Sequence, residues 1–353
     1  MQQSVRAPLA GDVVAVVSQS GPTVSFYDAA TDRHLDTVEV IAEPHELCFD
    51  PTQRLLWCST AYNSGYYHAN TGRRSELTVI DADTHRVVEV VDLAPEHGPH
   101  GLALDPVRGR LYVSVEGSAD RPGGVVVIDT ATRRPIGRID TDAPGPHWFV
   151  IDPTGTVGCA SNKEAPFVSL VDLERGTLTA KVEVPGSEGL AFSPDGSKVF
   201  VAAPYAAFGP AGNTTGARPT PGVRVIDPRT ATVTDTLATD HVMLPVHATA
   251  TGKLLVGEVR MEPVPDSQLG RQAPGRLTVF ATDDHARLGS VEVGLAPLTI
   301  TSSPDGQLGY VACAASSTVD VVHLDTLERL ARLEIPKRGE PGAHGMAYIP
   351  RNP

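Results

Sequence analysis

Short apolar segments recur along the whole chain, and each is bounded by glycine, proline or aspartate. Three consecutive segments show the spacing: RLYVSVEG (110–117), GVVVIDTAT (124–132) and RRPIGRID (133–140). Apolar runs of this length between turn-forming residues are typical of β-strands, and no long segment has the period of an amphipathic helix. The pattern therefore predicts an all-β protein built from many short strands.

The strands follow a repeat of roughly 40 to 55 residues, and each repeat holds four of them. One element of the repeat, V-x-V-I-D-x-x-T, is found in seven variants: VSFYDAATD (24–32), LTVIDADTH (77–85), VVVIDTATR (125–133), VSLVDLERG (168–176), VRVIDPRTA (223–231), LTVFATDDH (277–285) and VDVVHLDTL (319–327). Seven four-stranded units predict a single-domain, seven-bladed β-propeller.

The two ends of the chain predict how the ring closes. Residues 12–40 supply three strands of a blade without its innermost strand, and residues 344–350 supply an innermost strand alone. We expect these segments to pair, because pairing removes two free strand edges. The other six predicted blades span 45–92, 100–140, 147–184, 188–237, 247–293 and 298–335.

The repeat resembles the YVTN-type family of β-propellers, which includes surface-layer-like and cytochrome d1-like members. The resemblance rests on the V-I-D-x-x-T elements and on SPDGSKVFVA (193–202), SPDGQLGYVA (303–312) and DPVRGRLYVS (105–114). It covers essentially the whole chain and implies the propeller fold. Since that family includes binding proteins as well as enzymes, the resemblance leaves the chemistry open.

Histidine recurs at one position of the repeat, where the chain enters the innermost strand. Five segments carry it: EPHELCFDP (His45), GPHGLALDP (His100), GPHWFVIDP (His147), LPVHATATG (His247) and GAHGMAYIP (His344). In this alignment the two remaining positions hold Glu188 and Leu298. Seven positions drawn at random from a chain with 12 histidines in 353 residues are expected to hold less than one.

Innermost strands line the central channel of a propeller, so these side chains are expected to converge there. Imidazoles with a carboxylate suit Fe, Cu, Zn or Mn. We therefore predict a divalent transition metal on His45, His100, His147, His247 and His344. A structural alternative remains, in which the histidines only fix the strand entrances by hydrogen bonds to the backbone.

Further candidates lie near the same face, where the long insertions 61–76, 116–124, 204–222 and 258–276 also emerge. The predicted catalytic residues are Glu188, Glu116, Glu258, Tyr205 and Arg260. The carboxylates are candidate general acids or bases, and Arg260 is a candidate for binding a substrate carboxylate. Glu46 follows His45 in an alternating strand, so we expect its side chain to point away from the channel.

Three functions fit these residues. The first is a metal-dependent enzyme acting on a small organic molecule, with oxidoreductase chemistry favoured by the predominance of imidazole. The second is a lyase, isomerase or hydrolase, metal-assisted or metal-free, that uses the ring histidines as acids and bases. The third is a non-catalytic propeller that binds a ligand or a protein.

The net charge and the N-terminal sequence limit which partners and which location we expect for the protein. A net charge of −13 and a pI near 5.3 provide no basic stripe for phosphates, which makes nucleic acid an unfavourable partner. The sequence shows neither a signal peptide nor an apolar run of membrane-spanning length, so we expect a cytoplasmic protein without membrane contact. A chain trimmed of a signal peptide would instead be exported. The oligomeric state stays open.

Overall fold

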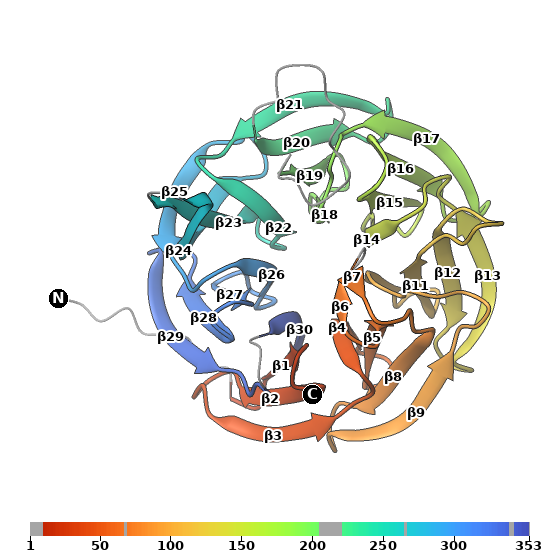
Figure 1. Ribbon diagram of the computed structural model, residues 1–353, viewed down its shortest axis with the longest axis horizontal. Coiled ribbons are helices and arrows are strands. Elements are labelled where there is room, and N and C mark those ends of the chain that lie inside the picture. Colours follow the sequence, from red (N-terminus) through yellow and green to blue (C-terminus); the bar gives the residue numbers. More distant parts are fainter. Residues whose placement is uncertain (1–9, 67–68, 205–220, 265–266, 339–341, 353) are drawn as a thin grey trace.

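Seven four-stranded antiparallel sheets form a closed ring around a central channel in the computed structural model (Figure 1). The structure describes residues 10–66, 69–204, 221–264, 267–338 and 342–352, and within these ranges all regular secondary structure is β-strand. The predicted seven-bladed β-propeller is confirmed. No helix in the described ranges is long and apolar enough to cross a membrane.

The strands of each blade follow one another from the channel outward. Blade 1 holds β30 (Ala343–Ile349), β1 (Val13–Ser18), β2 (Thr23–Asp28) and β3 (His34–Glu39). Blade 2 holds β4 (Glu43–Asp50), β5 (Leu55–Tyr62), β8 (Glu76–Asp81) and β9 (Arg86–Asp92). Blade 3 holds β10 (Leu102–Asp105), β11 (Arg110–Val115), β12 (Gly124–Asp129) and β13 (Arg134–Asp140). Blade 4 holds β14 (Pro146–Ile151), β15 (Val157–Asn162), β16 (Phe167–Asp172) and β17 (Thr177–Glu183).

The remaining three blades follow the same order. Blade 5 holds β18 (Leu190–Phe192), β19 (Val199–Ala203), β20 (Gly222–Asp227) and β21 (Thr232–Ala238). Blade 6 holds β22 (Val242–Ala248), β23 (Lys253–Val264), β24 (Ser267–Ala281) and β25 (Arg287–Glu292). Blade 7 holds β26 (Pro297–Ser302), β27 (Leu308–Cys313), β28 (Thr318–His323) and β29 (Glu328–Glu334).

The ring closes within blade 1, as the two chain ends predict. Strand β30 pairs antiparallel with β1, with Ala347 opposite Ala15 and Ile349 opposite Val13. The Tyr348 hydroxyl donates a hydrogen bond to Asp12. The last strand of the chain thus completes the sheet that the first three begin.

The hydrophobic core is divided among the blade interfaces. Each of the seven buried clusters draws its side chains from two adjacent blades. In one of them Trp57 and Val79 of blade 2 pack with Leu111 and Val113 of blade 3. No blade buries its apolar faces alone, so the ring as a whole is the folding unit.

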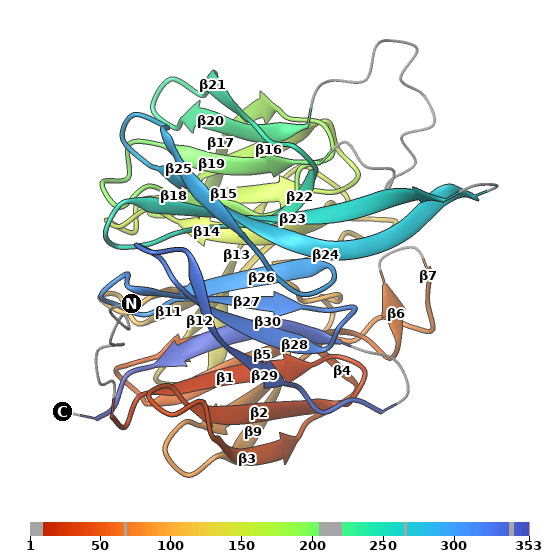
Figure 2. The ribbon, with the colours of Figure 1, turned by 90° about the vertical axis from the view of Figure 1, so that its left-hand side faces the viewer.

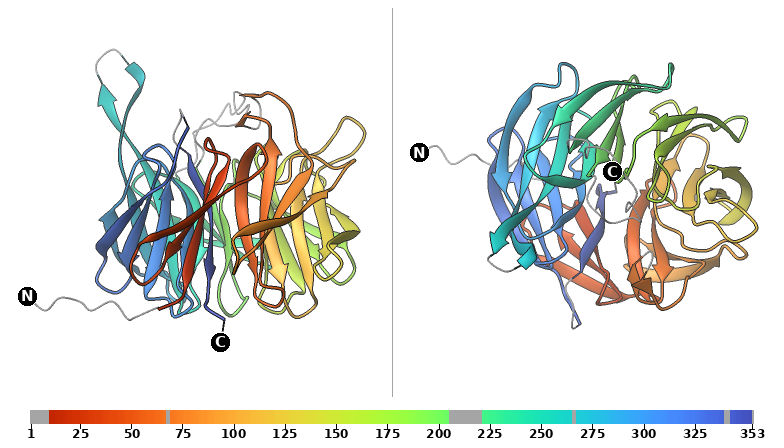
Figure 3. Two further views of the ribbon diagram at one scale, coloured as in Figure 1. Left: turned by 90° about the horizontal axis from the view of Figure 1, so that it is seen from below. Right: turned by 45° about the horizontal axis from the view of Figure 1, so that its top comes forward.

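Two elaborations project from one face of the ring (Figures 2 and 3). The hairpin of β6 (Gly65–Tyr66) and β7 (Ala69–Asn70) lies there, and so does the long ribbon formed by β23 and β24. The end of β30 lies at the opposite face (Figure 3). The ring histidines lie at the same face as the hairpin and the ribbon, because the chain enters the innermost strands from that face.

Candidate functional site

A β-bulge at the entrance of the innermost strands decides which side chains reach the channel. In β4 the register passes from Pro44 opposite Thr60 to Leu47 opposite Cys58, so three steps on one strand match two on the other. Bulges recur at the corresponding point of β14, β22, β26 and β30. A bulge adds a residue and interrupts the alternation of side chains between the two faces of a strand.

Buried serines of the second strands hold the backbone at these entrances. Ser59 Oγ accepts a hydrogen bond from the Glu46 amide at 3.1 Å and donates one to the carbonyl oxygen of His100 at 2.8 Å. Ser114 repeats the arrangement one blade further, between the Gly101 amide (2.8 Å) and the His147 carbonyl (2.5 Å). Each serine therefore ties one blade's entrance to that of the next.

Three histidines from consecutive blades meet at the channel. His45, His100 and His147 are buried, and each offers a ligand atom within 4.8 Å of those of the other two. The ring centroid of His100 lies 4.7 Å from that of His45 and 4.6 Å from that of His147, both in edge-to-face contact. The structure thus brings together three of the five predicted metal ligands in one group.

His344 forms a second group with His45 and Glu46. The rings of His45 and His344 lie 4.2 Å apart, and Glu46 Oε1 lies 3.5 Å from His45 Nδ1 and 3.2 Å from His344 Nδ1. The expectation that Glu46 points away from the channel is therefore wrong. The bulge in β4 is the reason, because it breaks the alternation on which that expectation rests.

His247 does not join either group, so its predicted place in the ring is corrected. Its Nε2 contacts Ser302 Oγ at 2.9 Å, and it lines a cavity of about 670 Å³ formed with the D-P and S-P-D-G turns. Leu244 occupies the ring position instead. Its carbonyl oxygen accepts a hydrogen bond from the Gly189 amide, which is the bond that the His147 carbonyl oxygen accepts from the Gly101 amide. The ring thus carries five consecutive polar side chains, His344, His45, His100, His147 and Glu188, followed by Leu244 and Leu298.

Glu116 lies directly behind His100. Its Oε1 is 3.2 Å from His100 Nε2, and the Tyr62 hydroxyl donates a hydrogen bond to the same oxygen while lying 3.0 Å from His100 Nε2. Arg73 Nε contacts Glu116 Oε2 at 2.8 Å. Burial alone would raise the pKa of Glu116, but His100, Tyr62 and Arg73 together lower it, so the carboxylate stays ionised.

Glu188 lies in the same way beside His147. Its Oε2 is 3.3 Å from His147 Nδ1, and Lys163 Nζ lies 3.7 Å from Oε1. Burial raises the pKa of Glu188 despite the nearby lysine. A carboxyl group with a raised pKa in contact with an imidazole is suited to hold or pass a proton.

The other predicted catalytic residues lie apart from the histidines. Glu258 is fully buried, where it accepts hydrogen bonds from Thr278 Oγ1 and from the His241 amide (2.9 Å), which indicates a structural role. Arg260 sits on the projecting ribbon and pairs with Glu292 at 3.5 Å. Tyr205 lies outside the described residues.

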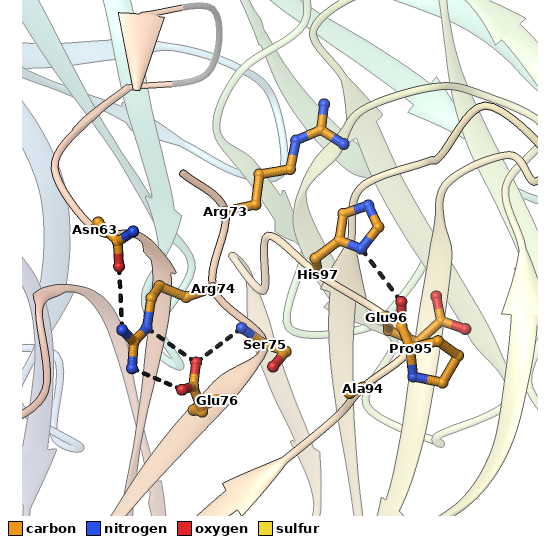
Figure 4. Close-up of a pocket in the computed structure, with 9 residues that line it drawn as sticks. All are labelled: Asn63, Arg73, Arg74, Ser75, Glu76, Ala94, Pro95, Glu96 and His97. Carbon is orange, nitrogen blue, oxygen red and sulfur yellow. Dashed lines mark hydrogen bonds and ion pairs between the residues drawn. The ribbon is translucent and has the colours of Figure 1, made fainter. Parts of the chain in front are cut away.

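A surface pocket of about 620 Å³ is lined by the residues drawn in Figure 4, and one of them, Arg73, contacts Glu116. Arg73 and His97 line it, and Arg74 forms its wall by bridging Asn63 and Glu76. Arg73 pairs with Glu116, and Glu116 contacts His100, so these two side chains connect the pocket to the histidine cluster.

Burial keeps the imidazoles of His45, His100 and His147 neutral. It lowers the pKa of His45 well below its usual value, aided by His344, and that of His147, aided by Lys163. Burial also lowers the pKa of His100, although Glu116 opposes the shift. Several buried nitrogen atoms lack a hydrogen-bond partner: His45 Nδ1, His100 Nδ1, His344 Nδ1 and both ring nitrogens of His147. Imidazole nitrogens with unused lone pairs are the donor set that a transition metal requires, so these residues fit such an ion.

Sequence reasoning missed four members of the site: Glu46, Tyr62, Arg73 and Lys163. Lys163 had a usable signal, because it stands two residues after Ser161 as Glu116 stands two after Ser114. Tyr62 and Arg73 belong to the insertion of blade 2, whose path depends on tertiary contacts and carries no repeat signal.

Comparisons with known proteins agree with the fold. No family model matches the chain. It is 27% identical over 155 residues to the uncharacterized protein YncE of Salmonella typhimurium, covering 43% of this chain and 42% of that protein. It is 25% identical over 305 residues to the seven-bladed beta-propeller protein Rv1057 of Mycobacterium tuberculosis, covering 85% of this chain and 64% of that protein. Both matches span less than two thirds of the relatives' own lengths.

Among solved structures, hydrazine synthase from Kuenenia stuttgartiensis superposes with a TM-score of 0.65 at 16% identity, covering 86% of this chain and 90% of that one. At this identity the likeness shows the fold alone. Fold and relatives together define the protein as a seven-bladed β-propeller, with a buried histidine cluster at one end of its channel.

Proposed function

We propose that this propeller is a metal-dependent enzyme that acts on a small organic molecule at the histidine cluster, with oxidation and reduction as its reaction class. The observation that carries the proposal is the group His45, His100 and His147, which is buried, neutral and rich in unpartnered nitrogen atoms. Such a cluster is unfavourable without a ligand, because unsatisfied buried polar atoms cost about 1–3 kcal/mol each. When bound, a transition metal supplies Lewis acidity or redox chemistry, and an all-imidazole set favours Fe, Cu or Zn.

The residues around the cluster have separable roles in this proposal. Glu116 and Tyr62 orient His100, as acceptors and donors behind metal-binding histidines commonly do. Glu188, whose pKa is raised by burial, is placed to exchange a proton with His147. Arg73 borders both Glu116 and the adjoining pocket, where a polar or anionic group of the substrate would meet its guanidinium.

Metal content tests the proposal. The protein is purified without an affinity tag or chelator, and Mn, Fe, Co, Ni, Cu and Zn are measured against protein concentration. We expect near-stoichiometric metal in the wild type and little in the double variant His100→Ala/His147→Ala. His247→Ala is the matched control and should keep its metal, because His247 lies outside the cluster. Full metal loading of the double variant would contradict the proposal.

An acid–base enzyme that needs no metal is the second candidate. It is favoured by the contact of Glu188 with both His147 and Lys163, a constellation able to move a proton unaided. A wild type that takes up no metal on reconstitution, yet shows turnover that Glu188→Gln abolishes, would support this candidate. Absence of both metal and turnover would leave a binding propeller.

A further inference from the structure

The group of His45, Glu46 and His344 is chemically distinct from the three-histidine group. It contains a carboxylate, and all three residues are buried, with ligand atoms within 4.8 Å of one another. The three-histidine group has its carboxylates, Glu116 and Glu188, only as outer contacts of His100 and His147.

The polar atoms of this group contact one another as ion pairs, without a hydrogen bond of normal geometry. Glu46 Oε1, His45 Nδ1 and His344 Nδ1 are all buried and none has a hydrogen-bond partner, although the oxygen lies 3.5 Å and 3.2 Å from the two nitrogens. A buried carboxylate oxygen that makes no hydrogen bond of normal geometry is costly, and a cation between these three atoms would reduce that cost.

We propose that His45, Glu46 and His344 form a second cation site, so that the channel holds two metal ions side by side. His45 belongs to both groups and would bind one ion through each ring nitrogen, which requires that its N–H proton be released to solvent when the second ion binds. The inference rests on the proposed function, because the neighbouring ion occupies the three-histidine group. A mixed imidazole and carboxylate set accepts Mn and Fe as well as Zn, so the two sites differ in preference. Paired ions commonly act by polarising one substrate group while generating a nucleophile or redox partner beside it.

The second site is tested by titrating metal-free protein with Cu²⁺, which both donor sets accept, and counting bound ions, with electron paramagnetic resonance recorded at each step. The wild type should bind two ions per chain, and the spectrum at saturation should show magnetic coupling between them. Glu46→Gln, which keeps the shape of the side chain, should bind one ion with an uncoupled spectrum. His147→Ala is the matched variant in the three-histidine group. It should likewise bind a single ion with an uncoupled spectrum.

The outcomes separate the second site from the proposed function. One uncoupled ion in the wild type, unchanged in Glu46→Gln and lost in His147→Ala, overturns the second site and leaves the proposed function standing. An ion that is lost in Glu46→Gln but kept in His147→Ala overturns the proposed three-histidine site. The number of ions that the wild type binds, and its spectrum, test the second site without any variant. The second site can therefore be refuted even if a variant misfolds.

Discussion

Burial is the feature that gives the ring histidines their chemistry. An exposed imidazole is partly protonated near neutral pH, and a protonated ring cannot bind metal. Burial lowers the pKa of His45, His100 and His147, so the lone pairs stay available under mildly acidic conditions. Metal retention should therefore persist below the usual histidine pKa of about 6.5.

Tyr62 provides a test of how the cluster is positioned. Tyr62→Phe removes the hydroxyl that contacts both Glu116 and His100 while keeping the ring. We expect metal affinity to fall about 10- to 100-fold, the usual effect of losing an outer hydrogen bond to a ligating histidine. Competition with a chromophoric chelator measures it. An unchanged affinity would show that Glu116 alone orients His100.

His247 provides a test of acid stability away from the histidine cluster. Burial lowers its pKa from 6.5 to about 4, so it stays neutral in the folded protein while the unfolded chain takes up a proton as the pH falls. The free energy of unfolding contributed by this residue therefore decreases from about pH 6.5 down to about pH 4. Between about pH 7.5 and about pH 5, His247→Gln should lose about 2 kcal/mol less stability than the wild type.

Urea unfolding of metal-free protein at the two pH values checks this expectation. Gln is chosen because it can still reach the hydroxyl of Ser302, the partner of His247. Parallel loss of stability in both proteins would show that His247 titrates normally in the folded state.

The positions of single site residues could be predicted only where the repeat defines them. The entrance position was identifiable, and four of its histidines lie together in the structure. Counting eight residues back from the turn glycine gives His147 from Gly155 and Glu188 from Gly196, and the same count from Gly252 gives Leu244. His247 was misassigned because alignment on residue type replaced this count. The position of Glu46 could not be predicted, since a bulge is a property of strand pairing.

At the scale of strands, the approach of neighbouring blades fixes the cluster's geometry. The inner strands come so close that a Cβ at Gly101 would lie 2.6 Å from the Phe149 amide nitrogen and 2.7 Å from the His147 carbonyl oxygen. Neither is the end of a flexible side chain. Glycine is therefore required at this position, and the placement of His147 depends on it.

Gly101→Ala should consequently destabilise the protein by about 2 kcal/mol and weaken metal binding, because the backbone of His147 must shift. Gly137→Ala is the control, since a Cβ there would meet only side-chain atoms of Val127, at 3.9 Å and beyond. We expect this control to leave stability unchanged or to raise it by roughly 0.5 kcal/mol. Chemical denaturation of both variants measures the difference. Equal stabilities would mean that the blades can separate without cost.

The strands of the repeat were predictable, but those of the insertions were not. The insertions 61–76 and 258–276 contain β6 and β7 and the projecting parts of β23 and β24, and the repeat predicts none of these. In that ribbon Met261 and Val264 are exposed, so no buried face imposes an alternating pattern. Such strands form by pairing with each other, and a hydrophobic pattern does not record this.

At the scale of the whole molecule, stability depends on ring closure. Every buried cluster spans two blades, and β30 covers the edge of β1 that would otherwise be free. Because β30 also carries His344, the closing strand joins the fold to the site. The seven-bladed ring and its closure were predictable because both follow from counting repeats.

A chain ending before residue 340 should therefore fail to fold into a soluble, cooperatively unfolding protein. Deletion of Arg351–Pro353 is the control and should lower the melting temperature only slightly, since it removes a 2.9 Å hydrogen bond from the Arg351 amide to Asp12 and leaves β30 intact. Calorimetry compares the two. A melting temperature in the shorter chain equal to that of the wild type would contradict closure through β30.

Binding of a transition metal by the channel histidines is tested most directly by anomalous X-ray diffraction at the absorption edge of the bound metal. Crystals of protein purified without chelator are measured above and below the edge. We predict an anomalous peak between the rings of His45, His100 and His147, and a second peak beside Glu46 and His344 after saturation with metal. Density confined to His247 or to surface carboxylates, with none at the cluster, would contradict metal binding by the channel histidines.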